Sequence, residues 1–283
     1  MLGMKAFGFV IVSAIALALL ALPGISPTRP AQNSYLGFDL NEYPGDDALP
    51  TLRKTFTFSS YWLTPAPGEK HNSWLGKRSL LAKQGFGFVV LYNGRLTRNL
   101  KSEPDAKRKG TNDAENAAKL AHQEGFRAGS VIFLDIEEGG RLTPAYHEYV
   151  GSWIDTLAQL HFRAGAYCSA VVLPDGPGHT ITTVTDLEEH LGGRKLVYWV
   201  FNDVCPPAPG CVFPQTPPPA AQSGIEHAMV WQFAQSPQQK KRTEQCAATY
   251  SADGNCYAPV DTQHKWLLDV NAATTANPSA PPE

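Results

Sequence analysis

Residues 131–138 read Val-Ile-Phe-Leu-Asp-Ile-Glu-Glu, an apolar run that ends in carboxylates. Side chains alternate between the two faces of a strand, so Asp135 and Glu137 are expected on one face with Cα atoms about 6.5–7 Å apart. Two neighbouring carboxyls push each other's pKa values apart, which suits acid and base catalysis. Because burying carboxylates is costly, the pair is a candidate catalytic site. The ordinary alternative is a strand end whose acids reach solvent or pair with a Lys or Arg.

Eight short apolar runs typical of strands must position this pair. They are residues 35–40, 56–63, 85–92, 131–137, 164–170, 196–202, 228–234 and 266–271. Helical patterns fill several gaps: residues 113–126, a helix capped by Thr143-Pro144, and residues 186–191. Strands alternating with helices over about 250 residues predict an α/β fold, a single-domain, TIM-like (β/α)8 barrel with some helices irregular or missing. An open doubly wound sheet is the alternative, although no Gly-rich phosphate turn follows the first strand.

Face parity predicts that further polar side chains lie beside the acid pair. Asp39, Gln232 and Asp269 each oppose the apolar face of their own strand. Because barrel enzymes carry active residues at the C-terminal ends of strands, we expect these three to meet Asp135 and Glu137 at one mouth. The weaker candidates for its wall are Tyr61, Tyr92, Tyr167 and Asn202. Trp62, Trp74 and Trp199 could line a glycan groove, but core packing is the favoured interpretation of each.

The strand motifs resemble those of a known family. They are Gly37-Phe38-Asp39, Leu134-Asp135-Ile136-Glu137, Trp231-Gln232-Phe233 and Leu268-Asp269-Val270-Asn271. Together they resemble the signature positions of family 25 glycoside hydrolases, which are barrel lysozymes that cut peptidoglycan. The overall layout is more similar to their relatives, the glycoside hydrolase-like domain of unknown function 1906, which includes exported actinobacterial proteins. The resemblance covers roughly residues 35–271.

The resemblance implies a role for each acid. Glu137 would be the general acid that protonates the leaving glycosidic oxygen, and Asp135 would orient or stabilise a charged intermediate, including one formed by the substrate's own N-acetyl group. Asp39 and Asp269 would bind sugar or tune Glu137. The implied partner is peptidoglycan or a related cell-envelope glycan.

Two other hypotheses fit the same sequence. The chain could be a non-catalytic glycan-binding module on this fold. It could also be a structural or partner-binding envelope protein that uses the Pro-rich loop between Cys205 and Cys211. Whether Asp39, Asp135, Glu137 and Asp269 share one open cleft distinguishes a catalytic site from these alternatives.

The N-terminus indicates export. Lys5 precedes an uncharged apolar stretch, residues 6–22, that is typical of a signal peptide; an uncleaved membrane anchor is the alternative. We expect a signal peptide and short linker over residues 1–33, a glycoside hydrolase-like domain over 34–272 and a disordered tail over 273–283. The protein is therefore expected in the cell envelope or outside the cell, with no stable membrane span after processing.

Cysteine usage agrees with an oxidising compartment. Cys205 with Cys211, and Cys246 with Cys256, are the economical disulfide assignment, and zinc binding by these four is the less favoured alternative. Cys168 fits a small buried strand residue. The net charge of −2 argues against nucleic acid as a partner. The eight histidines show no ligand spacing and no phosphate loop is present, so no metal or cofactor is expected, and the chain is expected to be a monomer.

Overall fold

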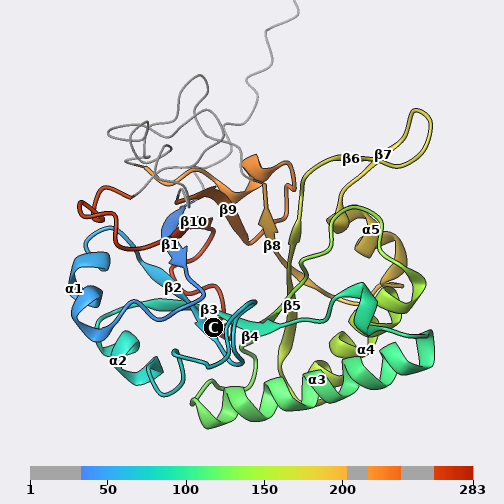
Figure 1. Cartoon of the computed structure of the whole chain (residues 1–283), viewed down its shortest axis with the longest axis horizontal. Coiled ribbons are helices and arrows are strands. Elements are labelled where there is room, and N and C mark those ends of the chain that lie inside the picture. Colours follow the sequence, from blue (N-terminus) through green and yellow to red (C-terminus); the bar gives the residue numbers. More distant parts are fainter. Residues whose placement is uncertain (1–32, 203–215, 237–257, 283) are drawn as a thin grey trace, which may run out of the picture. The chain divides into compact units, whose positions relative to one another are not determined.

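The computed structural model describes residues 33–202, 216–236 and 258–282. Within them, eight strands close into a barrel in the order β1-β10-β9-β8-β5-β4-β3-β2 (Figure 1). These are β1 (Tyr35–Asp39), β2 (Phe58–Trp62), β3 (Gly87–Asn93), β4 (Val131–Asp135), β5 (Arg163–Ser169), β8 (Val197–Phe201), β9 (Val230–Gln235) and β10 (Asp269–Ala273). Each of the eight predicted runs contributes one barrel strand, so the prediction of an eight-stranded α/β barrel is confirmed.

The helices around the barrel are uneven in length, as expected. They are α1 (Leu49–Leu52), α2 (Arg78–Lys83), α3 (Glu103–Gln123), α4 (Pro144–Gln159) and α5 (Thr183–His190). Three short 3-10 helices, η1 (Asp46–Ala48), η2 (Thr97–Asn99) and η3 (Ala220–Ser223), and a hairpin of β6 (Leu173–Pro174) and β7 (Thr180–Ile181) complete the described elements. The long helices α3 and α4 lie side by side outside β4 (Figure 1).

Local capping signals determine where these two long helices begin. The Thr143 side chain accepts a hydrogen bond from the Tyr146 backbone N–H and Pro144 occupies the first helical position, as predicted. By contrast, α3 begins at Glu103 rather than at Asp113, because Ser102 caps it by accepting from the Asp105 N–H. The charged first turns of α3 lack the apolar spacing from which the helix was predicted.

One strand runs against the predicted direction. Parallel pairing was expected throughout, but β10 pairs antiparallel with both β1 and β9. Asp269 is the first residue of β10, and the register places it opposite Asp39, the last residue of β1. Reversal therefore brings the start of β10 to the end of the barrel where the parallel strands finish.

Close backbone approach at two glycines shapes the barrel and its helical layer. A Cβ atom at Gly37 would lie 2.1 Å from the Phe58 ring, so the bare glycine gives that ring room against β1. A Cβ atom at Gly110 of α3 would lie 2.3 Å from the Tyr149 carbonyl oxygen of α4. Glycine is unfavourable within a helix, and here it permits close packing of α3 on α4.

The segment after β10 corrects the prediction of a disordered tail. The Ser279 side chain accepts from the Val90 N–H at 2.8 Å, its carbonyl accepts from the Val131 N–H at 3.0 Å, and Asn277 accepts from the Phe88 N–H at 2.8 Å. Residues 274–282 thus satisfy backbone donors near the beginnings of β3 and β4. Their small, Pro-rich composition was taken as disorder, but the same residues fit closely against strand ends.

Candidate active site

Most of the predicted side chains meet in one cavity at the carboxyl ends of the parallel strands, here called the barrel mouth. Its volume is about 240 Å³. Strand register explains the convergence, because Asp135 of β4 pairs with Tyr167 of β5, which in turn pairs with Trp199 of β8. The lining residues are Asp39, Asn41, Trp62, Pro67, Leu91, Asp135, Glu137, Tyr167, Trp199, Gln232, Gln235 and Asp269. The four acids named from the sequence therefore share one cavity.

Gln232 links two of these acids. Its Nε2 donates to Asp39 Oδ2 at 3.0 Å and to Asp269 Oδ2 at 3.3 Å. The Tyr167 hydroxyl donates to Gln232 Oε1 at 2.8 Å, which orients the amide so that its nitrogen faces the carboxyls. Burial raises the pKa of Tyr167 well above its ordinary value, so this phenol remains a hydrogen-bond donor.

Asn271 holds Asp39 from the neighbouring strand. Its Nδ2 donates to Asp39 Oδ2 at 2.6 Å, while its Oδ1 accepts from Trp199 Nε1 at 2.8 Å. Burial raises the pKa of Asp39 to about 6, although the hydrogen bonds from Asn271 and Gln232 act to lower it. Asp39 is thus a fixed acid that changes its charge close to neutral pH.

Asp135 is buried differently from Asp39. Its exposed fraction is 3%, and its Oδ2 atom accepts no hydrogen bond from a donor group of the described residues. Burial raises the pKa of Asp135 well above its usual value, and the nearby carboxyls of Glu137 and Asp39 raise it further. Asp135 therefore binds a proton more readily than an ordinary aspartate.

Glu137 reaches the barrel mouth from beyond the strand. Because β4 ends at Asp135, the two acids do not share a regular strand face as predicted. The chain stays extended for one more residue, since the Ile136 N–H donates to the Tyr167 carbonyl at 2.9 Å. Glu137 is exposed while lining the same cavity, so its carboxyl is accessible to a molecule bound there.

Three of the predicted wall residues lie outside the barrel mouth. Tyr61 is fully buried with its hydroxyl on Glu124, and the Tyr92 hydroxyl donates to Asp113 of α3 at 3.5 Å. Asn202 donates to the Ser223 carbonyl at 2.9 Å. Both tyrosines occupy the strand face that points away from the barrel axis, whereas their neighbours Trp62 and Leu91 line the cavity.

Several cavity residues were not predicted as site residues, although strand parity points to two of them. Trp62, for which core packing was favoured, and Leu91, which was missed, are the inward neighbours of the tyrosines proposed as wall residues. Trp62 and Trp199 were considered for a glycan groove, and both line the cavity although they are almost completely buried. Trp74, by contrast, is a packing residue whose Nε1 donates to the Asn41 carbonyl at 3.1 Å. Asn41, Pro67 and Gln235 belong to loops or strand ends where no periodic pattern marks them.

The disulfide predictions lie outside the described residues. Cys205, Cys211, Cys246 and Cys256 all belong to the ranges 203–215 and 237–257. Cys168 is fully buried in β5 with a free thiol, which confirms the prediction of a small buried strand residue.

Comparison with known proteins finds a family model that matches the part of the sequence containing the acid pair. Residues 70–204, just under half of the chain, match the family model described as "Rv2525c-like, glycoside hydrolase-like domain". This segment is similar to that family. The matched range contains Asp135, Glu137 and Tyr167, whereas Asp39, Gln232 and Asp269 lie outside it. A search of curated proteins finds no match.

Two solved structures share the barrel fold of this chain. An uncharacterized B. stearothermophilus protein is 17% identical, with a TM-score of 0.52 over 84% of this chain and 95% of that one. The Clostridium perfringens spore cortex lytic enzyme SleM is 14% identical, with a TM-score of 0.50 over 88% of this chain and 70% of that one. The Mycobacterium tuberculosis Tat-secreted protein Rv2525c is also similar, at 11% identity and a TM-score of 0.49 over 85% of this chain and 95% of that one.

Within the described ranges, no helix is both long and apolar enough to cross a membrane. The predicted signal peptide lies outside these ranges, so it stays a prediction from the sequence.

Proposed function

We propose that this protein hydrolyses glycosidic bonds in a cell-envelope glycan, with peptidoglycan as the first substrate to test. The observation that carries the proposal is the barrel mouth, where Asp39, Asp135, Glu137 and Asp269 line one cavity with two tryptophans. Paired carboxyls are what glycoside hydrolysis requires, because one proton must reach the leaving oxygen while negative charge stabilises the sugar cation.

Glu137 is the proposed general acid. Its carboxyl is exposed at the cavity, so it can approach a glycosidic oxygen that the buried Asp135 cannot reach. Burial and the neighbouring Glu137 carboxyl raise the pKa of Asp135, which favours a proton on Asp135. In the proposed step this proton passes from Asp135 to the Glu137 carboxylate, and Glu137 transfers it to the leaving oxygen as the glycosidic bond breaks. Asp135 then becomes negative as positive charge develops on the sugar.

The charge that appears on Asp135 is the second part of the proposed mechanism. A carboxylate at this depth is costly without a partner, but a neighbouring sugar cation supplies one. An N-acetyl group on the substrate could carry that positive charge as an internal nucleophile, and water would then complete hydrolysis. Asp39 and Asp269, held by Gln232, are proposed to position the sugar and adjust the charge around Glu137.

The walls of the barrel mouth support a sugar as the ligand. The flat rings of Trp62 and Trp199 provide apolar surface, while Tyr167, Gln232 and the acids supply hydrogen-bonding groups. A fold shared with a spore cortex lytic enzyme and the glycoside hydrolase-like family match both make a peptidoglycan-type glycan the first candidate. Export to the cell envelope is part of the proposal and rests on Lys5 and the apolar run of residues 6–22.

Release of soluble fragments from purified cell-wall sacculi tests this proposal. Wild-type protein should release reducing ends, and Glu137→Gln should reduce the rate by roughly 10²–10⁴-fold because the amide cannot donate the proton. Glu148→Gln is the matched control, since Glu148 is an exposed acid of α4 outside the barrel-mouth lining. Undiminished release by Glu137→Gln would exclude Glu137 as the acid.

Binding without cleavage would favour the alternative of a glycan-binding module. In that case wild type and Glu137→Gln should sediment equally with sacculi, and neither should release reducing ends. No release and no sedimentation with any envelope glycan would leave the structural or partner-binding hypothesis and would reject hydrolysis.

A further inference from the structure

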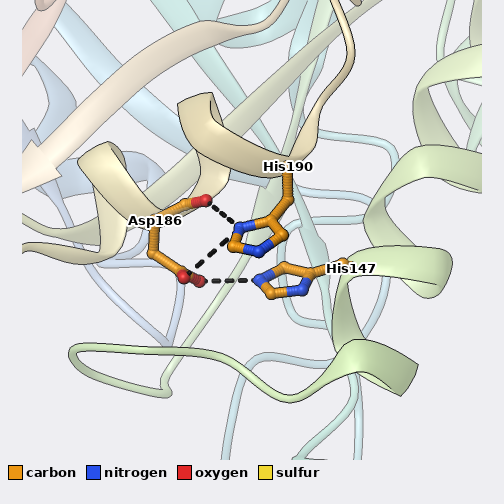
Figure 2. A group of neighbouring side chains, drawn as sticks. All are labelled: His147, Asp186 and His190. Carbon is orange, nitrogen blue, oxygen red and sulfur yellow. Dashed lines mark hydrogen bonds and ion pairs between the residues drawn. The ribbon is translucent and has the colours of Figure 1, made fainter.

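His147, Asp186 and His190 form a compact cluster between α4 and α5 (Figure 2), and none of them lines the barrel mouth. His147 Nε2 lies 2.7 Å from Asp186 Oδ2, and His190 Nδ1 lies 3.5 Å from Asp186 Oδ1. One potential ligand atom from each residue lies within 4.8 Å of the others. In the described part of the chain, this is the group of His, Cys, Asp and Glu side chains that could hold a metal ion.

The surroundings of the cluster carry excess negative charge. Arg141 is the cation there, and its guanidinium contacts Asp175 at 2.6 Å, Asp186 at 3.2 Å and Glu189 at 3.6 Å. Three carboxylates against one guanidinium leave two uncompensated negative charges when both imidazoles are neutral. A divalent cation would neutralise this excess without requiring both histidines to be protonated.

The central carboxylate is already oriented by the fold. Asp186 has no exposed surface, and its Oδ2 accepts from the Leu142 N–H at 2.9 Å while Oδ1 accepts from Arg141. Such partners are what fixes a metal-binding carboxylate in position. Asp186 and His190 are four residues apart on α5, so one helix face presents two ligands to His147 of the other helix.

We propose that His147, Asp186 and His190 bind a divalent transition-metal ion, for which Zn²⁺ is the probe. Two imidazoles and a carboxylate suit zinc, with water completing a tetrahedral set. The ion would replace the proton between His147 and Asp186.

The imidazoles of His147 and His190 are stacked with ring centres 3.8 Å apart and planes 8° apart, so both rings must tilt to aim a nitrogen at the ion. His190 is 39% exposed and has space to turn, and it would give up its 2.7 Å contact with the Asp186 carbonyl.

The ion would act on the loop that carries Glu137. Residues 136–143 connect β4 to α4, and Leu142 and Arg141 tie the end of that loop to Asp186. Metal binding at Asp186 would therefore stiffen the connection between α5 and this loop. The proposal does not depend on the proposed hydrolysis, because it rests only on residues of α4, α5 and the loop. The sequence did not reveal the site because its ligands are split between two helices.

Metal titration of the full-length protein tests the site. Protein stripped of metal with a chelating resin should bind Zn²⁺ in calorimetry, and its melting temperature should rise with free Zn²⁺. His147→Ala and His190→Ala should each weaken zinc affinity roughly 100-fold or more. His71→Ala is the control, because His71 is an exposed histidine outside the cluster. Its affinity should equal that of wild type.

Cobalt distinguishes this site from zinc binding by cysteine. Co²⁺ bound by His147, Asp186 and His190 should show visible absorption without the near-ultraviolet band of thiolate ligation, and alkylating the thiols should leave it unchanged. Circular dichroism checks that the more exposed His190→Ala variant is folded. The proposal is overturned if wild type fails to bind Zn²⁺ or if both histidine variants retain wild-type affinity.

Discussion

The two ends of the barrel carry side chains of opposite charge, and the groups that surround these charges differ. The barrel mouth has Asp39, Asp135, Glu137 and Asp269 around a cavity of about 240 Å³. At the other end, a cavity of about 410 Å³ is lined by Arg53, Arg78 and Arg127 together with the C-terminal segment. This end, which contains the beginnings of β2, β3 and β4, is here called the base.

The surroundings of the charged groups differ between the base and the mouth. At the base, the Arg78 guanidinium lies 4.9 Å from the Phe126 ring centre, and residues 277–279 satisfy backbone donors of β3 and β4. At the mouth, burial raises the pKa values of Asp39 and Asp135. The contrast teaches that buried acids with raised pKa values distinguish the candidate site better than polar residues in general.

Asp135→Asn should separate the two ends of the barrel most clearly, because it should lower the rate of hydrolysis without lowering stability. Hydrolysis should fall by about 10²–10³-fold, because the amide cannot become negative when the sugar cation forms. Stability should not fall, because an uncharged amide removes the cost of a buried carboxyl whose Oδ2 accepts no hydrogen bond from the described residues and which lies near the Glu137 carboxyl. Initial rates and urea unfolding measure the two effects. Wild-type rates in the variant would contradict the role proposed for Asp135.

The pH dependence of unfolding free energy in Asp39→Asn should reveal how much a negative charge at the barrel mouth costs in stability. The pKa of Asp39 rises from 3.8 in the unfolded chain to about 6 in the folded protein. Protonated Asp39 therefore stabilises the fold fully below the unfolded pKa, and this contribution is lost as pH rises through about 6. At about pH 8 the variant should exceed wild type by roughly 2–3 kcal/mol in unfolding free energy. Urea unfolding at several pH values measures this gain in stability, which should vanish near pH 3.5. A gain of the same size at every pH would contradict the prediction.

Ser279→Ala should affect the base alone. Removing the hydroxyl leaves the buried Val90 N–H without its 2.8 Å acceptor, while the backbone of the C-terminal segment remains in place. We expect a loss of about 1–3 kcal/mol in unfolding free energy. The rate of hydrolysis at saturating substrate should match wild type at a temperature where both are folded. A large loss of rate without loss of stability would remove the distinction between the ends.

Two tyrosines allow the smallest and most closely matched test. Tyr167→Phe removes the 2.8 Å hydrogen bond to Gln232 and should lower kcat/KM roughly 5–10-fold, equivalent to about 1 kcal/mol. Tyr61→Phe removes a hydrogen bond to Glu124 outside the mouth, so it should cost about 1 kcal/mol of stability and leave kcat/KM unchanged. If both changes had the same effect on kcat/KM, Tyr167 could not be assigned to the site and Tyr61 to the scaffold.

Much of the fold and the site could be predicted from local pattern. Alternating apolar residues identified all eight barrel strands, and parity placed Asp39, Gln232 and Asp269 on the inner face. The Thr143-Pro144 cap located the start of α4. These predictions succeed because a strand has a side-chain period of two and a helix start has a recognisable cap, so neighbouring residues contain the needed information.

Strand parity gave correct predictions on the strands to which it was applied, but it was not applied to all of them. Tyr61 and Tyr92 were proposed as wall residues for their chemistry, although the inward positions beside them belong to Trp62 and Leu91. The disordered-tail prediction failed for a different reason, since composition cannot show that Ser279 meets the Val90 N–H across the chain.

By itself, the sequence determined the number and order of the barrel strands, the inner face of the strands that carry Asp39, Gln232 and Asp269, and the acids available to that face. The tertiary structure alone decided that β10 runs antiparallel, which brings Asp269 beside Asp39, and that β4 ends before Glu137. It also decided the burial that raises the pKa of Asp135 and the meeting of His147 with Asp186. The physical reason is that periodicity acts between neighbours, whereas strand direction, burial and long-range contact depend on what distant segments place around a residue.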